Sequence, residues 1–259
     1  MKDSQLTDLN QNFIEELAAI GRVLNPSAEA KILARDNSAL TRDLIAILSC
    51  NELIETSEKR LDYVPLLAVQ LLRKMKAVES IDVMLYRLVN YVFVDELFNE
   101  LIFCLTEFGF PVLEPALKVY SEIGDAKEDS FIRTVILEIL SGISVRDSRI
   151  FSLLIEQLSS EAAPAADNLA DYGDPAAIPY LLSAFDRCAP RRKESEWEEE
   201  DIIEIAHAID ELGGELDSKQ TLIVQDVLST RLRRSRMESK RKTGKKLSLL
   251  RPGVSIRLR

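Results

Sequence analysis

The sequence predicts an all-α protein. Apolar residues recur at spacings of three and four over residues 1–230, and sustained alternation with period two, which marks a half-buried strand, is missing there. Helix start and stop signals interrupt this pattern, and the connections between them are short. Helices joined by short connections pack as antiparallel neighbours, so we expect roughly a dozen helices arranged in pairs.

The first helices are delimited by local signals. A stripe of apolar residues ends at Gly21, and Asn25 with Pro26 then supplies an N-cap and a first-turn proline. The stripe consists of Leu6, Leu9, Phe13, Leu17 and Ile20. Further along, Ser80 is placed to cap a helix over 81–92, and Asp95 a helix that Gly109 ends.

Two capping boxes predict the last helix starts. Ser195 with Glu198, and Asp217 with Gln220, have the spacing at which two side chains cap each other's backbone N–H groups. We expect the last helix to be held by four apolar residues. They are Leu222, Val224, Val227 and Leu228.

One segment, residues 161–186, has a more specific pattern. It consists of an alanine-rich stretch, a glycine turn at Gly173, and Asp174-Pro175 before another apolar stripe. The alanines allow neighbouring backbones to approach closely. Gly173 suits a left-handed C-cap, while Asp174 caps the helix that Pro175 begins.

This segment resembles the bacterial HEAT-type repeat, including the repeats of phycobilisome-lyase-like proteins. The resemblance implies a right-handed α-α superhelix, or solenoid, of antiparallel helix pairs. A fainter copy begins at Gly109, where the Gly-x-Pro-x-x-x-Pro layout of Gly173 to Pro179 occurs two repeat lengths earlier. We therefore expect a helical-repeat body over residues 1–230, whose best repeat is 161–186.

Charge separates a C-terminal extension, residues 231–259, from this body. The extension contains 12 Lys and Arg residues against one acid, Glu238, so it carries +11, whereas residues 1–230 carry -21 within a total of -10. Such an asymmetry of charge between two segments carries information about binding partners and not about the fold. The candidate partner-binding residues are Trp197, Arg231, Arg233, Arg234, Arg236, Lys240, Arg241, Lys242, Lys245 and Lys246.

Three interpretations of the basic extension remain open. It can lie along the acidic body, and this interpretation is slightly favoured because the acidic surface belongs to the same chain. It can contact nucleic-acid phosphates, or it can attract an anionic membrane surface, for which its few apolar residues provide a weak insertion face. Val254, Ile256 and Leu258 alternate, which indicates a short extended segment at the end.

No catalytic or metal-binding pattern is evident in the sequence. His207, the single histidine, lies off the apolar stripe of its predicted helix and should face solvent beside Glu204 and Glu211. We therefore expect no enzyme activity, cofactor or metal. Trp197, the single tryptophan, is expected to staple the start of its helix, while the alternative is an exposed contact site.

The leading functional hypothesis is a non-enzymatic scaffold or adaptor that binds protein partners on its solenoid surface. Two alternatives stay open: an enzyme like the bilin lyases, and an acidic inhibitor or immunity-type protein that masks a basic partner. Separate cysteines, the lack of a signal-peptide layout and the lack of a long apolar run predict a cytoplasmic protein without membrane insertion.

Overall fold

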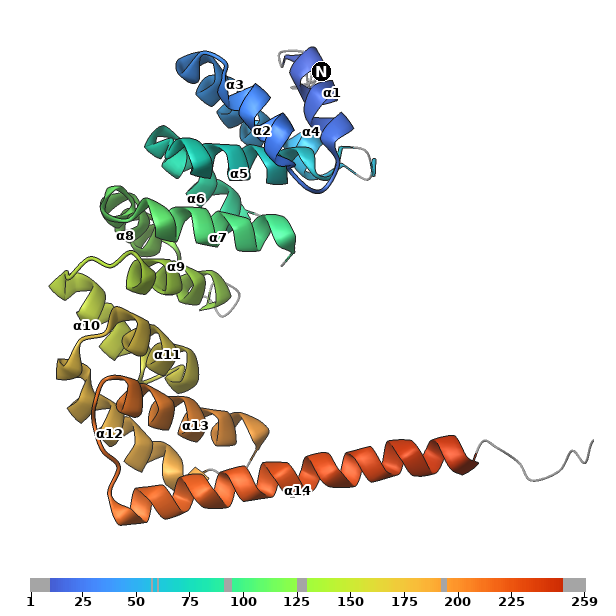
Figure 1. Cartoon of the computed structure of the whole chain (residues 1–259). Helices are drawn as coiled ribbons and strands as arrows, with labels where there is room; N and C mark the ends of the chain where they lie inside the picture. The colour runs from blue at the N-terminus through green and yellow to red at the C-terminus, as the bar shows by residue number, and fades with distance from the viewer. Residues whose placement is uncertain are drawn as a thin grey trace, which may run out of the picture. The chain divides into compact units, whose positions relative to one another are not determined.

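The computed structural model describes residues 10–56, 58–59, 61–90, 95–124, 130–191 and 195–248, with side chains up to Ser235 (Figure 1). The predicted all-α class is confirmed: within these ranges the chain is helical and contains no strand. The chain divides into two compact units, Met1–Leu154 and Ile155–Arg259.

The first unit is built from ten α-helices and two short 3-10 helices among its described residues. They are α1 (Gln11–Ile20), α2 (Pro26–Leu33), α3 (Asn37–Ser49), α4 (Asn51–Ile54), α5 (Val64–Met75), η2 (Val78–Ser80), α6 (Ile81–Asn90), α7 (Glu96–Phe108), η3 (Phe110–Val112), α8 (Leu113–Glu122), α9 (Ser130–Gly142) and α10 (Ser148–Gln157), whose last turn crosses into the second unit.

The second unit contains four complete α-helices among its described residues. Its elements are α11 (Ala162–Tyr172), η4 (Pro175–Ala177), α12 (Ile178–Cys188), η5 (Ala189–Arg191), α13 (Glu196–Glu211) and α14 (Ser218–Ser248). The last of these covers 31 residues and includes most of the basic extension, so this extension is helical up to Ser248. The alternating residues 254–258 lie outside the described residues.

Alternate helices of the first unit pack on one another in chain order, and some immediate neighbours are also in contact. The helices α3, α5, α7 and α9 contact one another in succession, while α6 packs on α7 and α8 (Figure 1). Close approach is visible between α7 and α9, where a Cβ on Gly142 would lie 2.7 Å from Cγ2 of Thr106. Leu67, Leu101 and Ile136 are fully buried on three of these helices.

In the second unit the alanine-rich helix α11 packs against α13, as α12 also does. Ala165 and Ala166 are fully buried, which agrees with small residues at a close helix contact. Leu181 and Phe185 of α12 are fully buried as well, so the predicted apolar stripe of that helix faces the core.

The same joint connects three helix pairs. A residue with positive φ ends the first helix, a 3-10 turn follows, and the second helix begins directly after it. The joint residues are Lys76 (φ 52°), Gly109 (φ 69°) and Gly173 (φ 68°). The stretch of sequence from Gly109 to Gly173 is nearly twice as long as the stretch from Lys76 to Gly109. The repeated layout that the sequence indicates at Gly109 and Gly173 therefore corresponds to a positive-φ glycine before a 3-10 turn at both places, while ψ differs, at -132° for Gly109 and 28° for Gly173.

Most local helix signals act as predicted. The Asn25 side chain accepts a hydrogen bond from the Ala28 N–H at 2.9 Å, and Asp95 caps α7 through the N–H groups of Leu97 and Phe98. Asp217 and Gln220 form the reciprocal box, with N–H to side-chain oxygen distances of 2.7 and 3.1 Å.

Two predictions about helix ends are wrong. Ser80 does not cap α6, because it belongs to the preceding 3-10 turn and its buried hydroxyl donates backwards to the Ala77 carbonyl at 2.6 Å. In α14, Leu222 and Leu228 are exposed, and of the expected apolar contacts only Val227 is buried. Polar contacts replace them at the start of this helix, where Gln220 donates to Asp186 of α12 at 3.0 Å.

No helix in the described part of the chain combines the length and the apolar character needed to cross a membrane.

The turn at Gly173 gives a direct test of the helix joint. A β-branched side chain is strained at φ 68° and ψ 28°, so Gly173→Val should lower the free energy of unfolding by about 2 kcal/mol. Gly173→Asn is the control, because asparagine tolerates this conformation and should lose much less. Urea unfolding followed by circular dichroism measures both, and equal midpoints for Val and Asn would show that the backbone at 173 is not left-handed.

Candidate functional site

The start of α13 is fixed by its own side chains. Ser195 is extended, and its Oγ accepts a hydrogen bond from the Glu198 N–H at 3.4 Å. The return contact differs from the predicted box, because the Glu198 carboxylate accepts from the Ser195 hydroxyl and not from its backbone N–H. Three acidic residues in this first turn also suit the positive end of the helix dipole.

A row of carboxylates from this first turn faces α14. Glu196, Glu199 and Glu200 are three and four residues apart, the spacing that places side chains on one side of a helix. Glu199 is the inner member, since its side chain is only 4% exposed. A carboxylate this deeply buried needs charged partners to offset its lost hydration.

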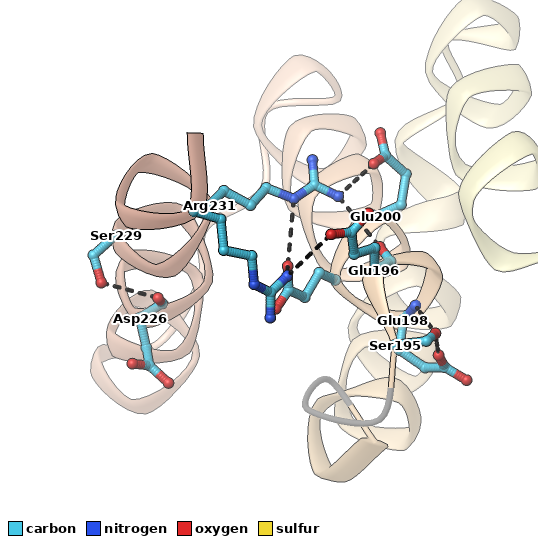
Figure 2. A network of polar contacts seen from close by, with 9 residues as sticks. Ser195, Glu196, Glu198, Glu200, Asp226, Ser229 and Arg231 are labelled. Atoms are coloured by element: carbon cyan, nitrogen blue, oxygen red, sulfur yellow. Dashed lines mark hydrogen bonds and ion pairs between the residues drawn. The ribbon is translucent and has the colours of Figure 1, made fainter. Parts of the chain in front are cut away.

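Arg231 and Arg234 of α14 supply those partners. Nη1 of Arg234 lies 2.8 Å from Oε2 of Glu199 and 3.7 Å from Oε1 of Glu196. The Nε of Arg231 lies 3.7 Å from the same Glu199 oxygen, while its Nη2 is paired with Glu200. Figure 2 shows Arg231 reaching across from α14 to Glu196 and Glu200 of α13.

The order of these pairs shows that α14 runs antiparallel to α13. Arg231 pairs with Glu200, whereas Arg234, three residues later, pairs with Glu196 at the beginning of α13. Because α13 begins at Glu196, the part of α14 after Ser235 continues past the N-terminal end of α13, as Figure 1 also shows. The contact between the basic extension and the acidic body is thus observed at the first residues of the extension.

Trp197 is exposed, so the expectation that it staples the helix start is wrong. Its exposed fraction is 82%, the highest among the large apolar side chains of the described residues. The buried apolar positions of α13 begin only at Ile202, and the inward position of the first turn is taken by Glu199. Trp197 is therefore exposed, as the alternative interpretation requires.

These side chains together line one open groove of about 490 Å³ within the second unit. Its lining residues are Glu196, Trp197, Glu199, Glu200, Arg231, Arg234 and Ser235. Three of the sequence-predicted partner-binding residues, Trp197, Arg231 and Arg234, are brought together here. The charges of the groove are largely paired, so its most prominent unpaired element is the indole ring.

The other predicted basic residues lie along the same helix. Arg233 is exposed, and it forms no ion pair with any residue that the structure describes. The remaining six belong to the helical backbone of α14, and their side chains lie outside the described residues. They are Arg236, Lys240, Arg241, Lys242, Lys245 and Lys246.

His207 and the cysteines are placed as the sequence predicts. His207 is 60% exposed, and its Nε2 lies 3.7 Å from Oε1 of Glu211. Cys50, Cys104 and Cys188 are buried free thiols, and burial raises the pKa of Cys104 to about 12. Among the residues described, no three His, Cys, Asp or Glu side chains are grouped so as to hold a metal ion.

Sequence reasoning missed the role of Asp201. The helix α11 has no capping side chain of its own, and its Ala163 N–H donates instead to Oδ1 of Asp201 on α13 at 3.0 Å. Burial raises the pKa of this carboxyl, against the opposing effect of the hydrogen bond from Ala163. No local signal indicates this cap, because the two residues are 38 positions apart.

No protein-family model, curated protein or solved structure gives a significant match to this chain.

The Asp201 cap predicts a dependence of stability on pH. Because the pKa is raised in the folded protein, the folded state binds a proton more readily than the unfolded chain, and this group contributes more stability as the pH falls through that raised pKa. Asp201→Asn keeps the acceptor oxygen without the buried charge. It should match or exceed the parent in stability at pH 7, and its advantage should shrink towards pH 4.

Asp201→Ala is the comparison variant, because it removes the acceptor and leaves the Ala163 N–H uncapped. We expect it to lose about 1 kcal/mol at both pH values. Thermal unfolding at pH 7 and pH 4 measures the three proteins. An Asn variant as unstable as the Ala variant at pH 7 would contradict the capping role.

Proposed function

We propose that this protein is a non-catalytic scaffold of the HEAT-like solenoid type, and that the surface around Trp197 binds a protein partner. The proposal joins two features, a series of similar helix pairs and one exposed tryptophan on a rigid helix start.

The helix pairs support the solenoid part of the proposal. The positive-φ joint followed by a 3-10 turn occurs at Lys76, Gly109 and Gly173. The interval from Lys76 to Gly109 is one length of a typical short helical repeat, and the interval to Gly173 is close to two. The helix pair α11 and α12, with its alanine-rich first helix and Asp174 cap, also has the sequence pattern that resembles the HEAT-type repeat. Stacked pairs of this kind present long surfaces for partners.

The exposure of Trp197 is the observation that carries the binding part. An indole ring that is 82% exposed leaves a large apolar area in water, while the helix that bears it is capped at Ser195 and tied to α14 by ion pairs. Tryptophan is one of the residue types enriched at the energetic centre of protein interfaces.

The same geometry disfavours the acidic-inhibitor alternative at this surface. The densest acidic run of the sequence, residues 196–201, contains five acids, and two arginines of the chain already bind three of them, Glu196, Glu199 and Glu200. A basic partner would have to displace Arg231 and Arg234 first. The bilin-lyase alternative has no support at this surface, and absorbance of the purified protein mixed with a bilin tests it directly.

Affinity purification of the tagged full-length protein from its native host tests the proposal. Partners that are retained by the parent and lost with Trp197→Ala are then purified and titrated. The substitution should weaken binding at least 30-fold, equivalent to the roughly 2 kcal/mol of an interface hot spot. Because Trp197 is the only tryptophan, its fluorescence should also shift to the blue when the partner covers it.

His207→Ala on the same helix is the matched control. Its side chain is exposed and outside the groove, so affinity should be unchanged and stability should alter by no more than about 0.5 kcal/mol. A partner that binds both variants equally, with unshifted Trp197 emission, would refute this surface as the binding site. Loss of an enzymatic activity with His207→Ala would refute the non-catalytic proposal.

A further inference from the structure

The C-terminal half of α14 is a dense cationic helix that continues beyond the body of its unit. Between residues 231 and 246 the sequence contains nine Lys and Arg residues and one acid, Glu238. At 1.5 Å per residue this stretch is roughly 24 Å long, so it carries about one cation per 2.7 Å of helix axis. Among its side chains that the structure describes, which end at Ser235, Arg231 and Arg234 are bound to carboxylates of α13.

The antiparallel register carries the rest of α14 beyond the first turn of α13. Arg234 already pairs with Glu196, the first residue of α13, and every later residue of α14 lies farther along the axis. Residues 1–230 carry a net charge of -21, which would repel polyanions from the body. An anionic partner is therefore favoured at the continuing part of α14.

The positions of the cations around the helix indicate which anion fits. With 100° per residue, Arg233, Arg236 and Lys240 form one row, and Arg234, Arg241 and Lys245 form a second row about 130° away. Arg231, Lys242 and Lys246 form a third row, next to the second. Cationic positions of the sequence thus fall on nearly opposite sides of an α-helix, whereas a flat anionic surface would be matched by cations on one side.

A duplex groove offers anions on both sides of a helix. The major groove of B-form DNA is about 12 Å wide, which admits one α-helix between two phosphate backbones. An A-form RNA duplex has a deep and narrow major groove that does not admit it. Membrane insertion is disfavoured because the stretch contains only Leu232 and Met237 as large apolar residues and has no apolar stripe.

We propose that the segment of α14 after Ser235 binds double-stranded DNA through its phosphates, without sequence specificity. This binding site is separate from the protein-binding surface at Trp197 and goes beyond the proposed scaffold function. The six cations from Arg236 to Lys246 are its contact residues, and Arg231 with Arg234 fix the helix to the body.

Fluorescence anisotropy of the full-length protein with a labelled 20-base-pair duplex tests the proposal. Six phosphate contacts predict that affinity falls about 10³-fold between 50 and 200 mM salt. The triple variant Lys240→Gln, Lys245→Gln and Lys246→Gln retains three contacts and should fall only about 40-fold over the same range, with weaker binding at 50 mM. Glutamine has a helix propensity close to that of lysine, so the helix content by circular dichroism should be unchanged.

Two controls keep the result interpretable. Lysine to arginine at the same three positions preserves charge and should bind like the parent. Lys31→Gln, Lys74→Gln and Lys118→Gln remove three charges from the first unit and should also leave DNA binding unchanged.

Anionic competitors decide between classes of partner. Poly-glutamate or vesicles containing phosphatidylserine that bind as tightly as the duplex would overturn the assignment to DNA, as would absence of duplex binding at 50 mM salt. A duplex affinity that is the same in the parent and in the Lys240, Lys245 and Lys246 glutamine variant would place any binding elsewhere. None of these outcomes alters the Trp197 test, which uses different residues.

Discussion

The candidate site depends on the ion pairs that the buried carboxylate of Glu199 forms with Arg231 and Arg234. This carboxylate lies on the inner side of the first turn of α13, and its Oε2 is approached by Arg234 at 2.8 Å and Arg231 at 3.7 Å. A buried carboxylate with one partner removed would be left poorly compensated, which makes such a pair of arginines costly to lose. Since Val227 is the only buried large apolar residue among those expected to hold α14, this polar cluster is a main attachment of that helix.

The cluster of Glu199, Arg231 and Arg234 determines which side chains the second unit exposes to solvent at the start of α13. By occupying the inward position, Glu199 leaves Trp197 directed to solvent. By pairing with the start of α13, Arg234 directs the remainder of α14 past that helix. An exposed indole and the cationic segment of α14 are therefore displayed at the same end of the unit, so a protein that used both as proposed would hold a protein partner close to DNA.

Local chemistry explains which features could be predicted from the sequence. Asn25, Asp95, the Asp217–Gln220 box and Gly173 act through backbone groups within four residues, and these predictions are confirmed. The contacts of Ser80, Trp197 and Leu222 depend on what the rest of the fold places beside them, and the predictions for these three residues are wrong. The Asp201 cap joins residues 38 positions apart, and the ion pairs of Glu199 join it to Arg231 and Arg234 on the next helix, so no local pattern indicates them.

Hydrogen exchange of the backbone amides in α14 tests the central claim that Glu199 attaches this helix. In the parent, amides from Thr221 to Ser235 should be protected, and Glu199→Gln should lower their protection at least tenfold while α11 and α12 keep theirs. Glu211→Gln, a change of the same kind at an exposed residue of α13, should have no effect on α14. Equal protection of α14 in the parent and in Glu199→Gln would contradict the claim.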